Sequence, residues 1–179
     1  ISYIEKLIIY LNDKIIKSQI ELGLLSIKDF QKYNYETFIK IIKIYLDILG
    51  FKNISPLNSD NNKLTNFKCI SNTDSILVSC AQNSLYGKEA KDEDDWETTG
   101  RPEIQSFLAR MYINDCKKGI FITNSYFSDL AIEFVDNFNN KNQDVEIKLI
   151  NGYELTKSIR NHKYYILKEE LLNETKYNI

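Results

Sequence analysis

The chain has 179 residues, of which 43% are hydrophobic and 27% charged, the mixture expected of one folded domain with an added helical element. Its net charge of −2 excludes a protein that is basic overall and grips nucleic acid by general phosphate neutralisation. DNA contact would therefore need a local basic face, a weak interaction or a shared partner. The sequence has no apolar run long enough to cross a membrane and no secretory signal at its start. The missing initiator Met predicts a fragment or a processed chain.

Cysteine usage indicates the redox compartment. Cys69, Cys80 and Cys116 are far apart, odd in number and without a C-x-x-C spacing. They predict buried thiols in a reducing environment, and hence a cytoplasmic protein. His162 lies in a polar stretch and is interpreted as a surface residue.

The first part of the chain predicts two helices. Residues 3 to about 22 carry apolar side chains at helical spacing, and Gly23 would end this helix, which we interpret as a linker or interface helix. Asn34 can cap a second helix over residues 35–49, which Gly50 ends. Because the second helix is apolar nearly all round, we expect it to be buried on more than one side.

A polar loop containing Pro56 is predicted over residues 53–62. Residues 64–70 and 75–80 then read as two strands of a hairpin, joined by a turn at residues 71–74. The stretch at 83–99 is rich in acidic residues between Lys88 and Asp95 and predicts a long solvated insertion.

From Pro102 onward the pattern alternates between helices and strands. Helices are expected from residue 102 to about 117, from Ser128 to about 138 and near 154–160, with strands at 119–123 and 145–150. Such alternation predicts parallel strands joined by right-handed crossovers. The tail from Tyr164 also looks helical.

Four blocks in this second half carry a family resemblance. They are Gly-Arg-Pro-Glu-Ile-Gln-Ser-Phe at 100–107, Lys-Gly-Ile-Phe-Ile-Thr-Asn-Ser-Tyr-Phe-Ser at 118–128, Ala-Ile-Glu-Phe at 131–134 and Lys-Leu-Ile-Asn-Gly-Tyr-Glu-Leu at 148–155. In this order they closely resemble the Mrr-like restriction endonucleases of the PD-(D/E)xK class, over roughly residues 34–161. The resemblance implies an α/β fold, a restriction-endonuclease-like mixed β-sheet flanked by helices, with an N-terminal leading helix.

The same resemblance implies a division of the chain. Residues 1–30 would form the N-terminal helix and linker segment, residues 31–162 the Mrr-like nuclease-fold core, and residues 163–179 a C-terminal helical tail.

The catalytic residues implied by the family are an Asp and a Gln/Glu-x-Lys, which bind Mg²⁺ and position water. Here Ser79 and Ala81 stand at the Gln/Glu and Lys positions, and alanine has neither charge nor donor. The metal-binding Asp aligns with Leu64, unless a shift makes Asp60 the ligand. Glu36 matches the acidic residue of the family's first helix.

Contacts to nucleic acid are predicted for Arg101, Gln105, Thr123 and Ser125. The two hydroxyls could donate to phosphate or could cap the next turn, and Arg101 could face DNA or ordinary solvent. Gln105 is expected to point toward the groove of the active site. The Gly100 backbone at a helix start is a further candidate for phosphate contact.

Three functions follow. The first is a DNA-binding domain of the Mrr-like family that does not cleave and needs no cofactor. The second is an active Mg²⁺-dependent endonuclease with a relocated site that uses Asp60, Glu36 and perhaps Lys91, from the Glu-Ala-Lys string at 89–91. The third is a structural or oligomerisation subunit of a DNA-defence system, which would assemble with itself or with another domain of a longer chain.

Overall fold

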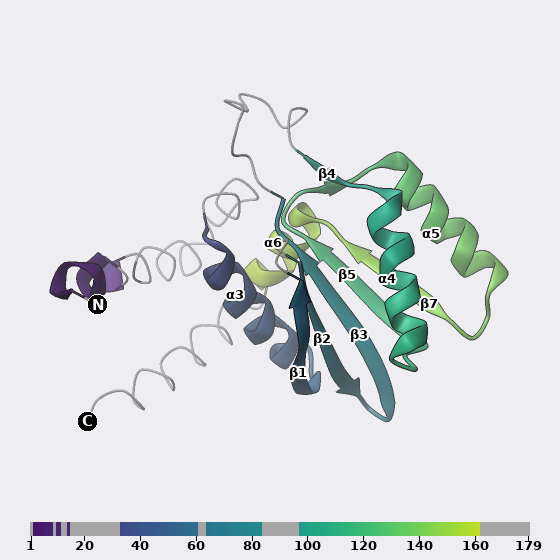
Figure 1. The fold of residues 1–179 in the computed structure, drawn as a ribbon, viewed down its shortest axis with the longest axis horizontal. Coiled ribbons are helices and arrows are strands. Elements are labelled where there is room, and N and C mark those ends of the chain that lie inside the picture. Colours follow the sequence, from purple (N-terminus) through teal and green to yellow (C-terminus); the bar gives the residue numbers. More distant parts are fainter. Residues whose placement is uncertain are drawn as a thin grey trace.

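The computed structural model describes residues 2–8, 10, 11, 14, 33–60, 64–83 and 97–161. In this part of the chain five strands form the main sheet in the order β1-β2-β3-β5-β7 (Figure 1). They are β1 (Lys52–Asp60), β2 (Leu64–Ser71), β3 (Asp74–Ala81), β5 (Lys118–Thr123) and β7 (Glu146–Ile150). The pairs β1-β2 and β2-β3 are antiparallel, and the pairs β3-β5 and β5-β7 are parallel. The predicted mixed sheet is confirmed.

Helices cover both faces of this sheet (Figure 1). One face, here called the α3/α6 face, packs against α3 (Tyr35–Ile48) and α6 (Gly152–Asn161). The other, the α4/α5 face, packs against α4 (Arg101–Ile113) and α5 (Asp129–Lys141). Beside the sheet, the short strands β4 (Thr98–Thr99) and β6 (Tyr126–Phe127) pair in parallel, so residues 98–99 are not part of a loop as predicted.

The helices begin where the sequence offers a side-chain acceptor. The side chain of Asn34 accepts a hydrogen bond from the Thr37 amide at 2.8 Å, and that of Ser128 accepts one from the Ala131 amide at 3.3 Å. Helix α6 is preceded by Asn151, which accepts from the Glu154 amide at 2.8 Å. These contacts satisfy amides that have no partner within the helix, which is why these polar residues fix the helix starts.

The prediction of a loop over residues 53–62 is wrong for residues 53–60, which belong to strand β1. Strand β1 is an edge strand, and Pro56 lies opposite Phe67 of β2. Proline is compatible with an edge strand because its missing N–H is not needed on the open side. The strand is also irregular, with Asn53 at φ 53° and register shifts at both ends. Its exposed polar residues removed the apolar alternation that marks a strand.

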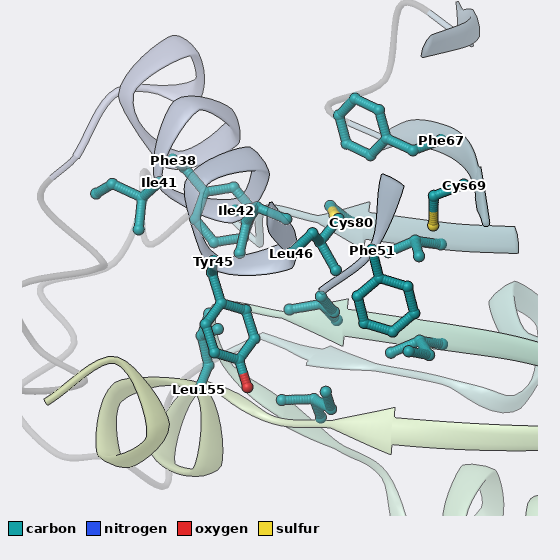
Figure 2. Packing of buried hydrophobic residues seen from close by; sticks show 14 of the residues in the cluster. Phe38, Ile41, Ile42, Tyr45, Leu46, Phe51, Phe67, Cys69, Cys80 and Leu155 are labelled. Carbon is teal, nitrogen blue, oxygen red and sulfur yellow. The ribbon is translucent and has the colours of Figure 1, made fainter. Parts of the chain in front are cut away.

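Helix α3 packs on the sheet through Phe38, Ile42 and Leu46, which are fully buried (Figure 2). At its side, the hydroxyls of Tyr45 and Ser158 of α6 are 2.7 Å apart. The helix is therefore buried on more than one side, as expected. It still presents an exposed charged stripe, whose members are Lys40, Lys43 and Asp47.

On the opposite face, helix α4 lies very close to strand β5. A Cβ atom at Gly119 would lie 2.7 Å from the Phe107 ring. Phe107 in turn packs edge-on against Phe121 at 5.3 Å between ring centroids. Glycine at this position therefore sets how closely α4 can approach the sheet.

Near the N-terminus, residues 3–8, 10, 11 and 14 are helical, consistent with the predicted leading helix. Their large apolar side chains face solvent, and the exposed fractions include 81% for Tyr3, 68% for Ile4 and 52% for Ile8. Within the described part of the chain, no helix has the length and apolar character needed to cross a membrane. The predictions for His162, for the tail from Tyr164 and for the insertion at 84–96 lie outside the described residues.

Candidate functional site

The site predicted from the sequence falls on the hairpin of β2 and β3. Its turn pairs Ser71 with Asp74, and this register places Asn66 opposite Ser79 and Leu64 opposite Ala81. Directly opposite residues of an antiparallel pair share one face of the sheet. All four therefore belong to the α4/α5 face, against whose core Leu64 and Ala81 pack.

A hydrogen bond joins the two polar members of this group. The Ser79 hydroxyl donates to the side-chain oxygen of Asn66, and the exposed fractions of the two residues are 0% and 3%. On the strands to either side, Leu57 lies opposite Asn66 and Phe121 lies beside Ser79. The pair is thus closed in by apolar neighbours and satisfies itself.

These residues do not fit a Mg²⁺ site. A hard divalent cation takes several oxygen ligands, usually with carboxylates among them, whereas Leu64 and Ala81 offer none and the Asn66 oxygen already accepts from Ser79. Among the residues that the structure describes, no group of three or more His, Cys, Asp or Glu could hold a metal ion. The Asp60 backbone pairs with Leu64 at the end of β1, but its side chain lies outside the described part.

The other acidic candidate, Glu36, does not lie on the face that carries Ser79. It is exposed in the first turn of α3, beside Tyr35, whose hydroxyl is hydrogen-bonded to Thr65. Thr65 lies opposite Cys80, and Cys80 belongs to the core on the α3/α6 face. Glu36 and Ser79 are thus associated with opposite faces of the sheet.

Glu36 instead lines a small surface cavity of about 310 Å³ together with Ile39, Lys40 and Lys43 of α3. Burial raises the pKa of the Tyr35 phenol at the same cavity, and its hydrogen bond with Thr65 opposes that rise. The lysines offset the Glu36 charge, so the cavity does not resemble a divalent-cation site.

Polar residues gather at the carboxyl ends of β3 and β5. The hydroxyl of Thr123 accepts from Thr99 at 3.2 Å and from the Ser125 amide at 3.2 Å. The Ser125 hydroxyl donates to the Glu97 carbonyl at 2.6 Å. Both Thr123 and Ser125 are fully buried. This geometry favours the alternative in which the two hydroxyls hold the turn, and their contact with phosphate stays a prediction.

Two asparagines complete this edge. The Asn83 amide donates to the Asn124 side chain at 2.8 Å, and the Asn124 side chain donates back to the Asn83 carbonyl at 3.1 Å. The Asn83 side chain also donates to the Glu97 carbonyl at 3.2 Å. The two described residues that flank the acidic insertion, Asn83 and Glu97, are thereby joined at the carboxyl edge of the sheet, close to the end of β3.

The two α4 candidates are both exposed. Arg101 is the first residue of the helix, and its guanidinium carbon lies 5.2 Å from the centroid of the Phe134 ring of α5. Gln105 follows Ile104, which is fully buried against the sheet. Arg101 and Gln105 are exposed whereas Asn66 and Ser79 are buried, and the predicted orientation of Gln105 toward a groove stays a prediction.

The three cysteines are buried and free, as predicted. Burial raises the pKa of the Cys69 thiol to about 11 and also raises the pKa values of Cys80 and Cys116. A thiol held in its neutral form is a poor nucleophile. Cys80 lies between Ser79 and Ala81, but it is not a catalytic candidate.

A mixed sheet with helices on both faces and a predicted catalytic hairpin defines a restriction-endonuclease-like α/β fold. A family model for the catalytic domain of Mrr, described as restriction endonuclease, matches residues 30–159. The chain therefore belongs to the Mrr-like restriction endonuclease family, whose members are typically metal-dependent nucleases acting on DNA. A comparison with curated proteins finds no significant match.

Asn66 is the residue of this site that the sequence interpretation missed. The signal was present, because a turn that pairs Ser71 with Asp74 also fixes Asn66 opposite Ser79. Counting the hairpin register outward from the turn would have identified it.

Proposed function

We propose that this chain is a DNA-binding domain of the Mrr-like family that does not cleave DNA by the metal chemistry of that family. The observation that carries the proposal is the Asn66–Ser79 hydrogen bond on the α4/α5 face. Two carboxylates at these positions would repel one another unless a cation lay between them. An amide and a hydroxyl form a neutral pair instead. Ala81 supplies no ammonium group to position water.

Retention of the family fold supports the DNA-binding part of this proposal. The family acts on DNA, and residues 30–159 match its model along most of the core. Because the chain has a net charge of −2, we expect binding that is weak and strongly reduced by salt. Arg101 is the predicted contact residue that remains exposed and charged.

The test measures DNA binding and cleavage in the same preparation. Fluorescence anisotropy with a short duplex at low salt should give an affinity that Mg²⁺ does not increase relative to EDTA at matched ionic strength, because no ion is needed. Supercoiled plasmid incubated with Mg²⁺ or Mn²⁺ should remain uncut. Absence of duplex binding would overturn the DNA-binding proposal, and nicking with either metal would overturn the proposed loss of cleavage.

Plasmid nicking would instead support the relocated-site alternative with Asp60, Glu36 and Lys91. A Glu36→Gln variant then provides a control, because its loss of cleavage is expected only if Glu36 takes part in that site.

A second candidate function, assembly with another subunit or another domain, is favoured by one observation. Six large apolar side chains near the N-terminus are exposed, namely those of Tyr3, Ile4, Leu7, Ile8, Tyr10 and Leu11. Exposed apolar surface on this scale commonly marks an interface. Light scattering should report a species larger than the monomer, and a Leu7→Glu, Ile8→Glu variant should return it to the monomer. A strict monomer would contradict self-association.

A further inference from the structure

A groove runs along α5 beside the start of α4. Its volume is about 440 Å³, within the usual range for ligand sites. The side chains that matter for its chemistry come from one stripe of α5 and from the first residue of α4: Arg101, Glu133, Phe134, Asn137, Phe138 and Lys141.

Two aromatic rings line the groove, and both are partly buried because they also pack against the core on the α4/α5 face. The rings of Phe134 and Phe138 are stacked, with centroids 6.3 Å apart and planes inclined by 27°. The Arg101 guanidinium lies over the Phe134 ring at 5.2 Å, while Arg101 remains an exposed residue. When an aromatic ring holds one face of a guanidinium, the other face of the guanidinium can stack on another planar group. Nucleobases stack on such arginine planes and on aromatic rings.

The polar side chains of the groove suit the rest of a nucleotide. Lys141, in the last turn of α5, is exposed and can contact a phosphate, as can Arg101. The Asn137 amide can pair with the edge of a base, and the Glu133 carboxylate can accept from an exocyclic amine. Both residues are exposed along the same stripe of the helix.

The neighbouring stripe of α5 sets the form of nucleic acid that fits. It carries Asp129 and Asp136, which line an adjoining acidic hollow together with Glu133. A duplex carries phosphates on both strands, and the phosphates of one strand would approach these carboxylates and be repelled by them. The bases of a duplex are also stacked inside the double helix and could not reach Phe138. A single strand avoids both costs, because its phosphates can follow Arg101 and Lys141 while its bases turn toward the aromatic rings.

The groove begins near the carboxyl edge of the sheet. Arg101 follows Gly100 and Thr99, and the Thr99 hydroxyl donates to Thr123 at that edge. We infer that the Arg101–Phe138–Lys141 groove binds an unpaired nucleotide of single-stranded DNA. This inference rests on the proposed DNA-binding function and adds a second mode of contact, with an unpaired nucleotide, in which Arg101 is shared with the predicted duplex contact.

The experiment compares a short fluorescent single strand with a duplex of the same sequence, both measured by anisotropy at low salt. Arg101→Ala and Lys141→Glu should each weaken single-strand binding by about fivefold to tenfold. Phe138→Leu retains an apolar side chain but removes the aromatic face, so it should weaken binding by about tenfold, the usual effect of losing one stacked base. Melting curves establish that each variant remains folded.

Lys148→Glu is the matched charge control. Lys148 is exposed on β7 and lies opposite Ile120, which belongs to the core on the α3/α6 face, so it is on the other side of the sheet. The Lys148→Glu substitution makes the same charge change as Lys141→Glu. It should alter single-strand affinity less than about twofold, because it lies away from the proposed contact.

The two probes separate the two proposals. Single-strand binding that depends on Arg101, Phe138 and Lys141, but not on Lys148, supports the groove. Single-strand binding that is absent, that is unchanged in all groove variants, or that falls equally in Lys148→Glu overturns it. If the duplex still binds in any of these cases, the proposed function stands without the groove. If neither probe binds, both proposals fail.

Discussion

The β2–β3 hairpin and the unit formed by α4, β5 and α5 differ in what their sequences specify. The second unit keeps the residue blocks of the Mrr-like family, and its packing depends on them, as at Gly119 beneath Phe107. The hairpin keeps its strands, whereas the family resemblance predicts that Ser79 and Ala81 stand where the family uses a Gln/Glu and a Lys. A strand can exchange such side chains because its hydrogen bonds come from the backbone. The residues that determine the packing of the fold are therefore different from those that the family uses for catalysis.

The largest effect is expected where a glycine sets the packing distance. Gly119→Val would place a branched side chain against Phe107, 2.7 Å from the position of the first added carbon. We expect a loss of about 3 kcal/mol or more in the free energy of unfolding, at the upper end for overpacked cores. Urea denaturation measures it. Ala81→Val at the partly exposed end of β3 is the control and should cost less than about 1 kcal/mol. Similar losses of stability at both positions would contradict the expected difference between Gly119 and Ala81.

The next prediction introduces charged residues into the hairpin: Ser79→Glu and Ala81→Lys match the family pattern, and Asn66→Asp adds a carboxylate opposite position 79. Asn66→Asp, Ser79→Glu and Ala81→Lys together should create a divalent-cation site, because the three side chains share one face near the end of the sheet. A metal ion at about 100 times its Kd would then stabilise the variant by about 2.7 kcal/mol. Thermal melting with and without Mn²⁺ measures the difference. Ala81→Lys alone should show none, and a triple variant insensitive to Mn²⁺ would show that the site lacks further required residues.

Much of the fold could be predicted from the sequence, and the reasons differ by region. The helices capped by Asn34 and Ser128, and the strand at β5, have local signals that tertiary contacts only reinforce. Strand β1 could not be found by apolar alternation, because its edge position leaves polar side chains exposed. It is specified by pairing with β2, which is not a local signal.

Which positions form the candidate site stays a prediction, and the sequence does not show how their side chains lie relative to one another. Ser79 and Ala81 are candidates by resemblance to the family's Gln/Glu-x-Lys pattern, whereas the side of the sheet on which Glu36 lies depends on how α3 packs. Sequence spacing does not contain that information. Asn66 could have been identified from the hairpin register, and its pairing with Ser79 could then have been anticipated.

A smaller effect is expected from the Asn66–Ser79 pair itself. Ser79→Ala leaves the buried Asn66 side chain without its donor and should cost about 1–3 kcal/mol in the free energy of unfolding. Adding Asn66→Leu should recover part of this loss, because two apolar groups of similar shape leave no unsatisfied atom. A double-mutant cycle measured by urea denaturation gives the coupling. Additive losses would indicate that the two side chains do not depend on one another.

The smallest effect concerns the other face of the same hairpin, where the thiols of Cys69 and Cys80 contribute to the core. With the pKa of Cys69 at about 11 against an ordinary value of 9.0, its folded thiol stays neutral in mildly alkaline buffer. A thiol-specific chromogenic reagent should therefore react very slowly with the native protein and fully after unfolding in urea. The free energy of unfolding should therefore depend on pH. The neutral Cys69 thiol contributes fully to stability below the ordinary pKa, and this contribution is lost as pH rises through the pKa of the folded state. Rapid labelling of Cys69 or Cys80 in the native protein, assigned by peptide mapping, would show a reactive thiolate in the hairpin and would remove the distinction between its two faces.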